Sequence, residues 1–256
     1  MKRLLALVLA LCLSLSLLPG CSTDDYAKYV AAVEKTNKLE ALQGQMKMLV
    51  GIKTQGLSME IPLTLDFKQR IDDGELTLYQ KQSMEFLGYK QEIEQYYVDG
   101  VYYVSEDGYK YKVEQSLEDI DELLSPSVLN FEKGDLVSSS GEKVDKGTKY
   151  TATISGSAIE TYLYDVLNMP LDELLDGMAG LEDVEIDIPD TTVYFIIDKA
   201  GYICEYSMIL EFSVTVDEAT VSCSLDFTMS LFDLGKDVTI DFPDFSEYEG
   251  YSWLWL

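Results

Sequence analysis

The sequence contains no histidine. This absence excludes Ser-His-Asp and Cys-His nucleophilic catalysis, zinc sites built on imidazole, and the commonest general base near neutral pH. An enzyme would have to use paired carboxylates, a Lys or Tyr base, or a metal held by oxygen ligands. No motif for such chemistry stands out, so we expect no enzymatic activity, no catalytic residues and no cofactor.

Basic residues are scarce. The chain has 19 Lys and Arg against 46 Asp and Glu, a formal net charge of −27. Affinity for nucleic acid comes from neutralising phosphates with Lys and Arg, so we expect no nucleic acid partner. An acidic surface also repels anionic lipid headgroups, and any membrane attachment should therefore depend on acyl chains. The charge is better explained as a means of keeping an extracellular domain soluble.

Long apolar runs are missing except at the start. Lys2 and Arg3 precede an apolar run over residues 4–17, and Leu18-Pro19-Gly20-Cys21 closes it, which is the layout of a secretory signal peptide. A run of about fourteen residues is shorter than the roughly twenty that cross a bilayer. The closing segment resembles a bacterial lipobox, in which the cysteine receives a diacylglycerol. We expect residues 1–20 to be the signal peptide, 21–25 a lipidated tether anchored at Cys21, and 26–256 a single domain at the extracytoplasmic face of the cell membrane.

Cysteine is also rare, and two cysteines remain in the domain, Cys204 and Cys223. A hairpin that turns near residues 217–220 would place Cys223 beside Phe212 and Cys204 beside Leu231. The cysteines would then lie about eight residues apart along the ladder, or roughly 27 Å. A disulfide needs Cα atoms within about 7 Å. We therefore expect two free thiols on the apolar side of the sheet, each with a raised pKa.

Two local patterns that suggest chemistry have plainer explanations. Residues 140–143 fit the S-x-x-K spacing of penicillin-recognising enzymes, but they lie in a stretch typical of strand and turn. Asp183, Glu185 and Asp187 share a face, yet they lack the glycine-turned loop of a calcium site. We expect no metal site.

Hydrophobic periodicity predicts mostly strands. Met59 to Ile71 alternates between apolar and polar residues, as a strand with one buried face does. The pairs Asp73-Gly74, Asp99-Gly100 and Asp107-Gly108 predict type I′ hairpins. Together these patterns predict an α+β fold with an antiparallel sheet covered by helices on one side. The expected helices are 24–42, 117–124, one opened by the capping box at Ser157, and 171–178; the expected late strands are 193–198, 202–216 and 221–234.

This order of elements resembles the LolA/LppX/LprG-like envelope lipoproteins. The residues that carry the resemblance are the hairpin 97–103, the strand and turn 193–201, and the ending 237–243. The resemblance implies a strongly curved antiparallel half-barrel sheet with helices packed on its concave face. In the members that carry lipids or lipoproteins, that face holds acyl chains. No functional residue can be transferred from the resemblance.

Alternating apolar residues supply a candidate lining for such a hollow. An alternative explanation is that they form an ordinary core beneath the helices, and for any single residue this explanation is favoured. The candidate ligand-binding residues are Ile61, Leu63, Leu65, Phe67, Met208, Leu210, Phe212, Leu225, Phe227 and Met229.

Two functions of different classes remain open. The first is a lipid-anchored, monomeric lipoprotein that binds, carries or senses a hydrophobic, lipid-like ligand. The alternative is a cell-surface adhesion or glycan-binding module without catalytic activity. Its candidate residues are Trp253 and Trp255, because aromatic rings stack on sugars.

Overall fold

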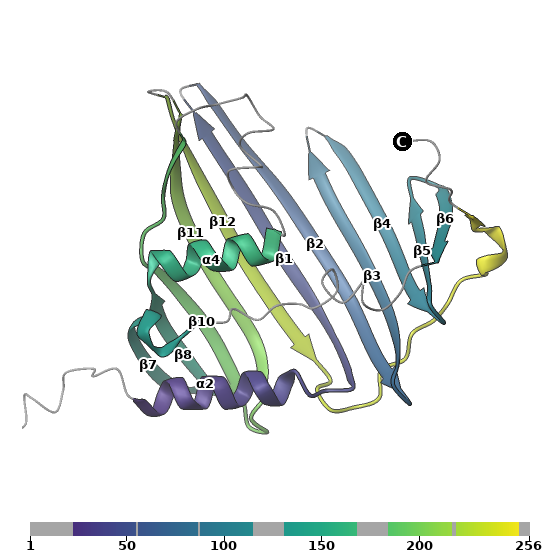
Figure 1. Ribbon diagram of the computed structural model, residues 1–256, viewed down its shortest axis with the longest axis horizontal. Coiled ribbons are helices and arrows are strands. Elements are labelled where there is room, and N and C mark those ends of the chain that lie inside the picture. Colours follow the sequence, from purple (N-terminus) through teal and green to yellow (C-terminus); the bar gives the residue numbers. More distant parts are fainter. Residues whose placement is uncertain are drawn as a thin grey trace, which may run out of the picture.

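The computed structural model describes residues 23–54, 56–86, 88–114, 131–167, 184–216 and 219–250. Within these residues thirteen strands form one sheet, in the order β13-β6-β5-β4-β3-β2-β1-β12-β11-β10-β8-β7, with β9 also paired to β11. Two helices lie in front of the sheet in Figure 1. They are α2 (Thr23–Thr36) and α4 (Gly156–Leu167). The predicted helices 117–124 and 171–178 lie outside the described residues.

The first half of the sheet is an antiparallel meander. Its strands are β1 (Ala41–Thr54), β2 (Leu57–Asp72), β3 (Glu75–Phe86), β4 (Tyr89–Val98), β5 (Val101–Glu106) and β6 (Tyr109–Glu114). At the three Asp-Gly pairs both residues have positive φ, for example 53° at Asp99 and 76° at Gly100. This is the backbone of a type I′ turn. The predicted hairpins are therefore confirmed, and Tyr96 pairs with Tyr103 as expected.

The second half of the sheet comes from the C-terminal part of the chain. It contains β7 (Leu136–Val144), β8 (Gly147–Ile154), β9 (Val184–Asp187), β10 (Thr191–Asp198), β11 (Ile203–Val216) and β12 (Ala219–Phe232). Residues 140–143 lie in β7 and not on a helix. The two halves join where β1 pairs with β12, from Gln43↔Phe232 to Lys53↔Ser222.

Strand pairing divides the sheet into two faces. We call the face that carries Phe67, Met208 and Phe227 the inner face, and the opposite one the outer face. The register keeps apolar side chains together on the inner face: Met48 lies between Leu63 and Phe227, and Phe227 lies opposite Met208. Gly44 of β1 is needed there because a Cβ atom would come within 2.6 Å of the Phe67 ring.

The main core lies at one end of the inner face, beneath α2. Tyr29 of this helix packs on Phe131 and Phe195, with ring centroids 4.7 Å apart in each pair. Thr36 near the end of α2 accepts a hydrogen bond from the backbone N–H of Ile203. Ile159 in the first turn of α4 is also fully buried in this core. We predicted helices packed on the concave face of the sheet. Apart from these contacts of α2 and α4, that packing stays a prediction.

The C-terminal segment crosses the outer face of β2 to β6. Lys68 donates a hydrogen bond to the Thr239 carbonyl, and the ring of Phe245, in a short 3-10 helix (Phe245–Glu247), stacks on Tyr103 with centroids 3.8 Å apart. The segment ends as β13 (Glu249–Gly250), which pairs in parallel with β6 and lies along that edge of the sheet. Its Val238, Ile240 and Tyr248 are buried.

Three local predictions need correction. The first helix ends at Thr36 and not at Leu42, because Leu42 belongs to β1, where it is buried in the core. The helix expected to open at Ser157 begins at Gly156, whose backbone N–H donates to Asp190. The late hairpin strands are 203–216 and 219–232, a shift of one or two residues.

Cys204 and Cys223 are free thiols, as predicted. Cys223 pairs with Phe212 and Val221 with Val214, the expected register. Cys204, however, does not lie among apolar groups. A bulge in the β10–β11 pairing gives Ile203 the buried position opposite Ile197. Cys204 is half-buried near Asp198, Lys146 and Glu205; burial and, to a smaller extent, Asp198 raise the pKa of its thiol.

Candidate ligand-binding face

All ten candidate lining residues lie on the inner face. Strand β2 supplies Ile61, Leu63, Leu65 and Phe67, β11 supplies Met208, Leu210 and Phe212, and β12 supplies Leu225, Phe227 and Met229. Cross-strand pairing through β1 makes them neighbours, since Met46 lies between Leu65 and Met229 and Val50 lies between Ile61 and Leu225. The structure therefore brings the predicted residues together on one surface.

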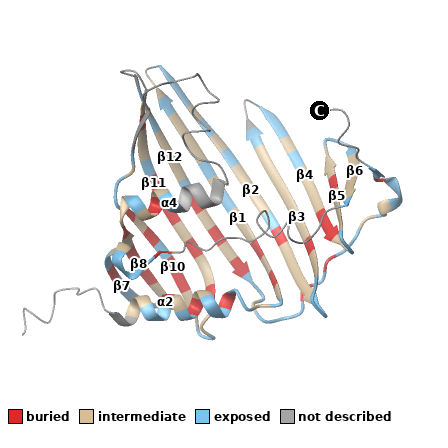
Figure 2. Cartoon of the chain, viewed as in Figure 1, coloured by how far each residue is buried: buried red, intermediate tan, exposed pale blue. Residues whose placement is uncertain are grey.

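Five of the ten residues belong to the packed core. Phe67, Met208, Leu210, Phe227 and Met229 are each less than 9% exposed. They pack with Tyr206, Ile154 and Tyr29 in one cluster. The buried residues gather toward the end of the sheet where α2 lies, at the bottom of Figure 2. For these five residues, packing within the protein accounts for their apolar character.

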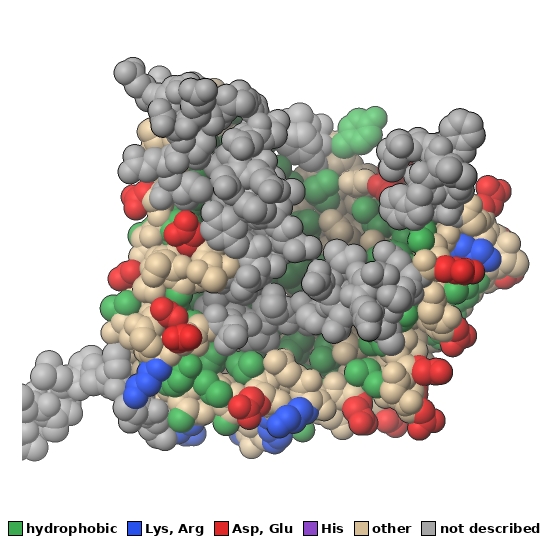
Figure 3. All heavy atoms as spheres, viewed as in Figure 1, with side chains coloured by type: hydrophobic (Ala, Val, Ile, Leu, Met, Phe, Trp, Pro, Cys, Tyr) green, Lys and Arg blue, Asp and Glu red, His purple; other side chains and the backbone are tan. Residues whose placement is uncertain are grey.

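The other five candidate residues are only half-buried, as are several apolar side chains beside them on β1 and β2. Three cross-strand rows contain most of them, around Met48↔Leu63, Val50↔Ile61 and Ile52↔Met59. In Figure 3 hydrophobic side chains are visible in a hollow between the parts drawn in grey. We call the half-buried set the apolar strip: Val50, Ile52, Met59, Ile61, Leu63, Phe212, Cys223 and Leu225.

The strip is uncharged. Burial raises the pKa of the Cys223 thiol, so this group is protonated and behaves as a small hydrophobe at neutral pH. On the outer face, the same strands carry Lys53, Glu60 and Asp226. At the end of the sheet away from the core, these strands therefore carry apolar side chains on the inner face and charged side chains on the outer face.

An open recess of about 500 Å³ lies at the ends of β1, β2, β11 and β12. Its walls include Ile52, Met59, Phe212 and Cys223 of the strip. The remaining walls are mostly polar: Gly51, Lys53, Ser58, Glu60, Asp187, Pro189, Glu211, Ser213, Ser222 and Ser224. Phe212 is the member of the predicted lining found there.

Strand β1 is the part of this surface that the sequence prediction left out. Its Met46, Met48, Val50 and Ile52 lie between the predicted residues of β2 and β12. The alternation of apolar and polar residues in β1 was visible in the sequence. The signal that was missing is the pairing of β1 with β12, because these strands are far apart along the chain.

The inner face changes character on β3 and β4. Gln80 lies directly opposite Gln95, and Gln82 lies opposite Ile93. These three glutamines are half-buried. Beyond them Leu78 and Tyr97, both buried, form a small second cluster with Leu76 and Tyr102. The inner face thus has an apolar part and an adjoining part rich in amides.

The acidic residues considered for a calcium site lie on and beside β9. Asp187 is exposed on β9, and Glu185 is on the same strand, while Asp183 lies outside the described residues. Within the described part of the chain, no three His, Cys, Asp or Glu side chains form a group that could hold a metal ion.

The difference between core and strip can be measured with two leucines. We predict that Leu210→Ala lowers the free energy of unfolding by about 2–5 kcal/mol, because it leaves a cavity in a packed core. Leu63→Ala should cost less than half as much, because Leu63 is only partly buried and lies outside the packed core. Chemical denaturation of the ligand-free protein measures both. Equal losses would show that Leu63 is core and that the strip is not a free surface.

None of the helices in the described residues is both long enough and apolar enough to span a bilayer. A search of curated proteins finds no relative. Among solved structures, the chain is similar to LprF from Mycobacterium bovis, with 12% identity, a TM-score of 0.43, and coverage of 87% of this chain and 98% of that one. It is also similar to the lipoprotein LppX of Mycobacterium tuberculosis, with 10% identity, a TM-score of 0.41, and coverage of 84% and 97%.

A third similar structure is a DUF1329 family protein from Desulfovibrio piger, with 11% identity, a TM-score of 0.25, and coverage of 84% and 94%. At these identities and TM-scores nothing about ligand or activity follows from the similarity. Residues 29–244 match a single family model, and the chain therefore belongs to DUF6612, a family of unknown function.

Proposed function

We propose that this protein is a lipid-anchored lipoprotein at the extracytoplasmic face of the bacterial membrane, and that it binds a hydrophobic, lipid-like ligand on the inner face of its sheet. The observation that carries the proposal is the apolar strip. Its eight side chains are contiguous across β2, β1, β12 and β11. All eight stay half-buried; Phe212 and Leu225 also pack against the edge of the core, and the other six lie beyond it.

The strip has the chemistry that an acyl chain requires. Burying an alkyl chain contributes about 0.8 kcal/mol per methylene, so an eight-carbon chain laid along the strip contributes at most about 6 kcal/mol. Met59 suits such a surface because its side chain is flexible and polarizable. A polar ligand would gain little from these residues, and the one group among them that could act as a nucleophile, the Cys223 thiol, has its pKa raised by burial and stays protonated.

The position of the first helix fits anchoring at Cys21. Helix α2 begins at Thr23, two residues after this cysteine. Its Lys28 and Asp25 form a surface ion pair, whereas Tyr29 and Ala32 are buried against the sheet. A diacylglycerol on Cys21 would therefore hold the sheet close to the membrane surface, within reach of membrane lipids.

The alternative function, glycan binding, depends on Trp253 and Trp255. Both residues lie outside the described part of the chain. The described structure offers two strongly exposed tyrosines, Tyr89 at 84% and Tyr109 at 77%, but both are at the ends of hairpins. The apolar strip favours the lipid-like ligand.

Native mass spectrometry tests ligand binding. The mature chain with Cys21→Ser is suitable, because every contact described above is made by residues 23–250. We expect it to retain a lipid-sized mass, or to bind added octanoate or palmitate. The variant Ile61→Glu, on the strip, should lose this mass, whereas the matched variant Thr64→Glu, on the outer face of the same strand, should keep it. A wild-type chain that binds none of these molecules would contradict the proposed function.

Membrane fractionation tests the anchor. Replacing Cys21 by Ser should release the chain from membranes or leave an unprocessed precursor, while thermal unfolding stays unchanged because the described core is formed by Tyr29 and later residues. A Cys21→Ser chain that is still processed and still sediments with membranes would show that another segment attaches the protein.

A further inference from the structure

We propose that the inner face of β3 and β4 binds the polar end of the ligand and selects an uncharged, hydrogen-bonding headgroup. The ligand class is a neutral acylglycerol, preferred over an anionic phospholipid of the same chain length. This inference rests on the proposed function, since the strip must first bind the acyl chains.

The glutamine amides adjoin the strip directly. Leu63 of the strip pairs with Met84 on β3, so Gln82 is its diagonal neighbour on the same face. Diagonal neighbours lie about 7–8 Å apart, within reach of a long side chain. Gln82 is also opposite Leu65, and Gln80 is opposite Phe67. A ligand whose chain lies on the strip can therefore place its head over these amides.

The three amides are available for hydrogen bonds. Within the described residues, the side chains of Gln80, Gln82 and Gln95 have no hydrogen-bond partner. By contrast, Gln43, Gln45 and Gln91 donate to the carboxylates of Asp233, Asp66 and Glu106. Each free amide offers two donor hydrogens and one acceptor oxygen. This mixture of donors and acceptors can pair with hydroxyl and ester groups, both of which are uncharged.

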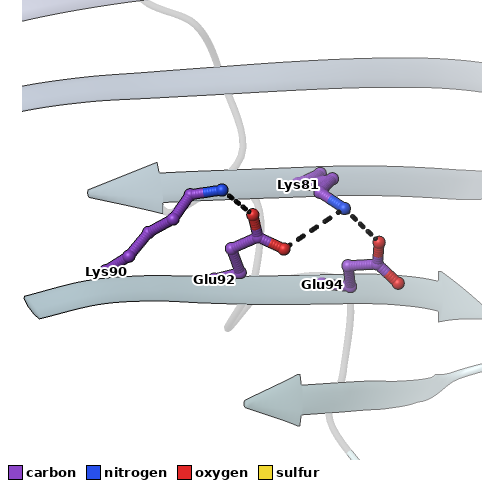
Figure 4. Close-up of polar contacts among 4 residues, drawn as sticks. All are labelled: Lys81, Lys90, Glu92 and Glu94. Carbon is purple, nitrogen blue, oxygen red and sulfur yellow. Dashed lines mark hydrogen bonds and ion pairs between the residues drawn. The ribbon is translucent and has the colours of Figure 1, made fainter. Parts of the chain in front are cut away.

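The charged side chains of this half of the sheet disfavour an anionic headgroup on the inner face. On the described strands β1 to β6 the register places every Lys and Arg on the outer face. Figure 4 shows two of them held by carboxylates: Lys90 lies 2.5 Å from Glu92, and Lys81 lies 2.9 Å from Glu94. The register thus places these cations on the side of the sheet away from the proposed ligand, where carboxylates pair with them.

One carboxylate remains on the inner face of these strands. Glu106 accepts a hydrogen bond from Gln91 at 2.5 Å, and it lies two strands from Gln82, with Ile93 of β4 between them. A phosphate headgroup over the glutamines would thus meet a like charge and no cation from the described strands β1 to β6, and burial of a charge without a partner is unfavourable. An uncharged headgroup is not repelled by Glu106 and does not bury an unpaired charge.

Short-chain lipids with matched acyl groups test the selection. Binding of dioctanoylglycerol and of dioctanoylphosphatidylglycerol to the mature Cys21→Ser chain is measured by native mass spectrometry and calorimetry. We expect dioctanoylglycerol to bind at least tenfold more tightly. Gln82→Lys should reduce this ratio at least fivefold by adding a cation to the inner face. The control Ser83→Lys adds the same charge to the outer face of β3 and should leave the ratio unchanged.

Each contrary outcome has a distinct meaning. If dioctanoylphosphatidylglycerol binds as tightly as dioctanoylglycerol, or more tightly, the headgroup selection is wrong while ligand binding holds. If Ser83→Lys changes the ratio as much as Gln82→Lys does, the selection comes from overall charge and not from the amides. If neither lipid binds, and octanoate does not bind either, the proposed function is wrong and this inference fails with it.

Discussion

The pairing of β1 with β12 is the interaction on which the rest of the structure depends. It joins the first strand of the N-terminal meander to the last strand of the C-terminal half, over the register from Gln43↔Phe232 to Lys53↔Ser222. A shift of one residue in this ladder would turn every apolar side chain of one half to the opposite face. In the observed register Met48, Val50 and Ile52 meet Phe227, Leu225 and Cys223. Because the apolar residues of β1 and β12 lie opposite one another in this register, the two halves of the sheet share one inner face.

The lengths of the strands at this junction explain why the inner face is not entirely core. Strand β2 has 16 residues and β1, β11 and β12 have 14 each, so the longest is roughly 54 Å. Helix α2 has 14 residues and is only about 21 Å long. Its described contacts are with the end of the sheet near Phe195 and Ile203. Apolar side chains that continue past this cover become the strip, and their exposure is what a hydrophobic ligand would relieve.

Local pattern predicted much of this fold. The alternation from Met59 to Ile71 predicts β2, and the three Asp-Gly pairs predict hairpins whose backbone angles are those of type I′ turns. These features depend on neighbours in sequence. The end of the first helix could not be predicted from sequence neighbours, because Leu42 fits a helical stripe as well as a strand. Leu42 belongs to β1 because it is buried in the core there. Likewise the bulge that moves Cys204 away from the apolar side comes from the pairing with β10.

The candidate site was predicted in part. Alternation identified the ten apolar residues and their common face, but it could not separate Leu210, in the core, from Leu63, in the strip. That difference depends on where a helix packs. The unpartnered glutamines were invisible for a similar reason: Gln80 and Gln95 become neighbours only when β3 and β4 pair.

A palmitate that carries a diazirine near its methyl end crosslinks to the residues that its acyl chain touches. Photocrosslinking with this probe therefore tests whether the acyl chain lies on the apolar strip. The account predicts adducts on the strip, at Val50, Ile52, Met59 and Ile61, and few on the outer face at Lys53, Glu60 or Thr64. Adducts spread over both faces, or confined to residues outside the strip, would contradict it.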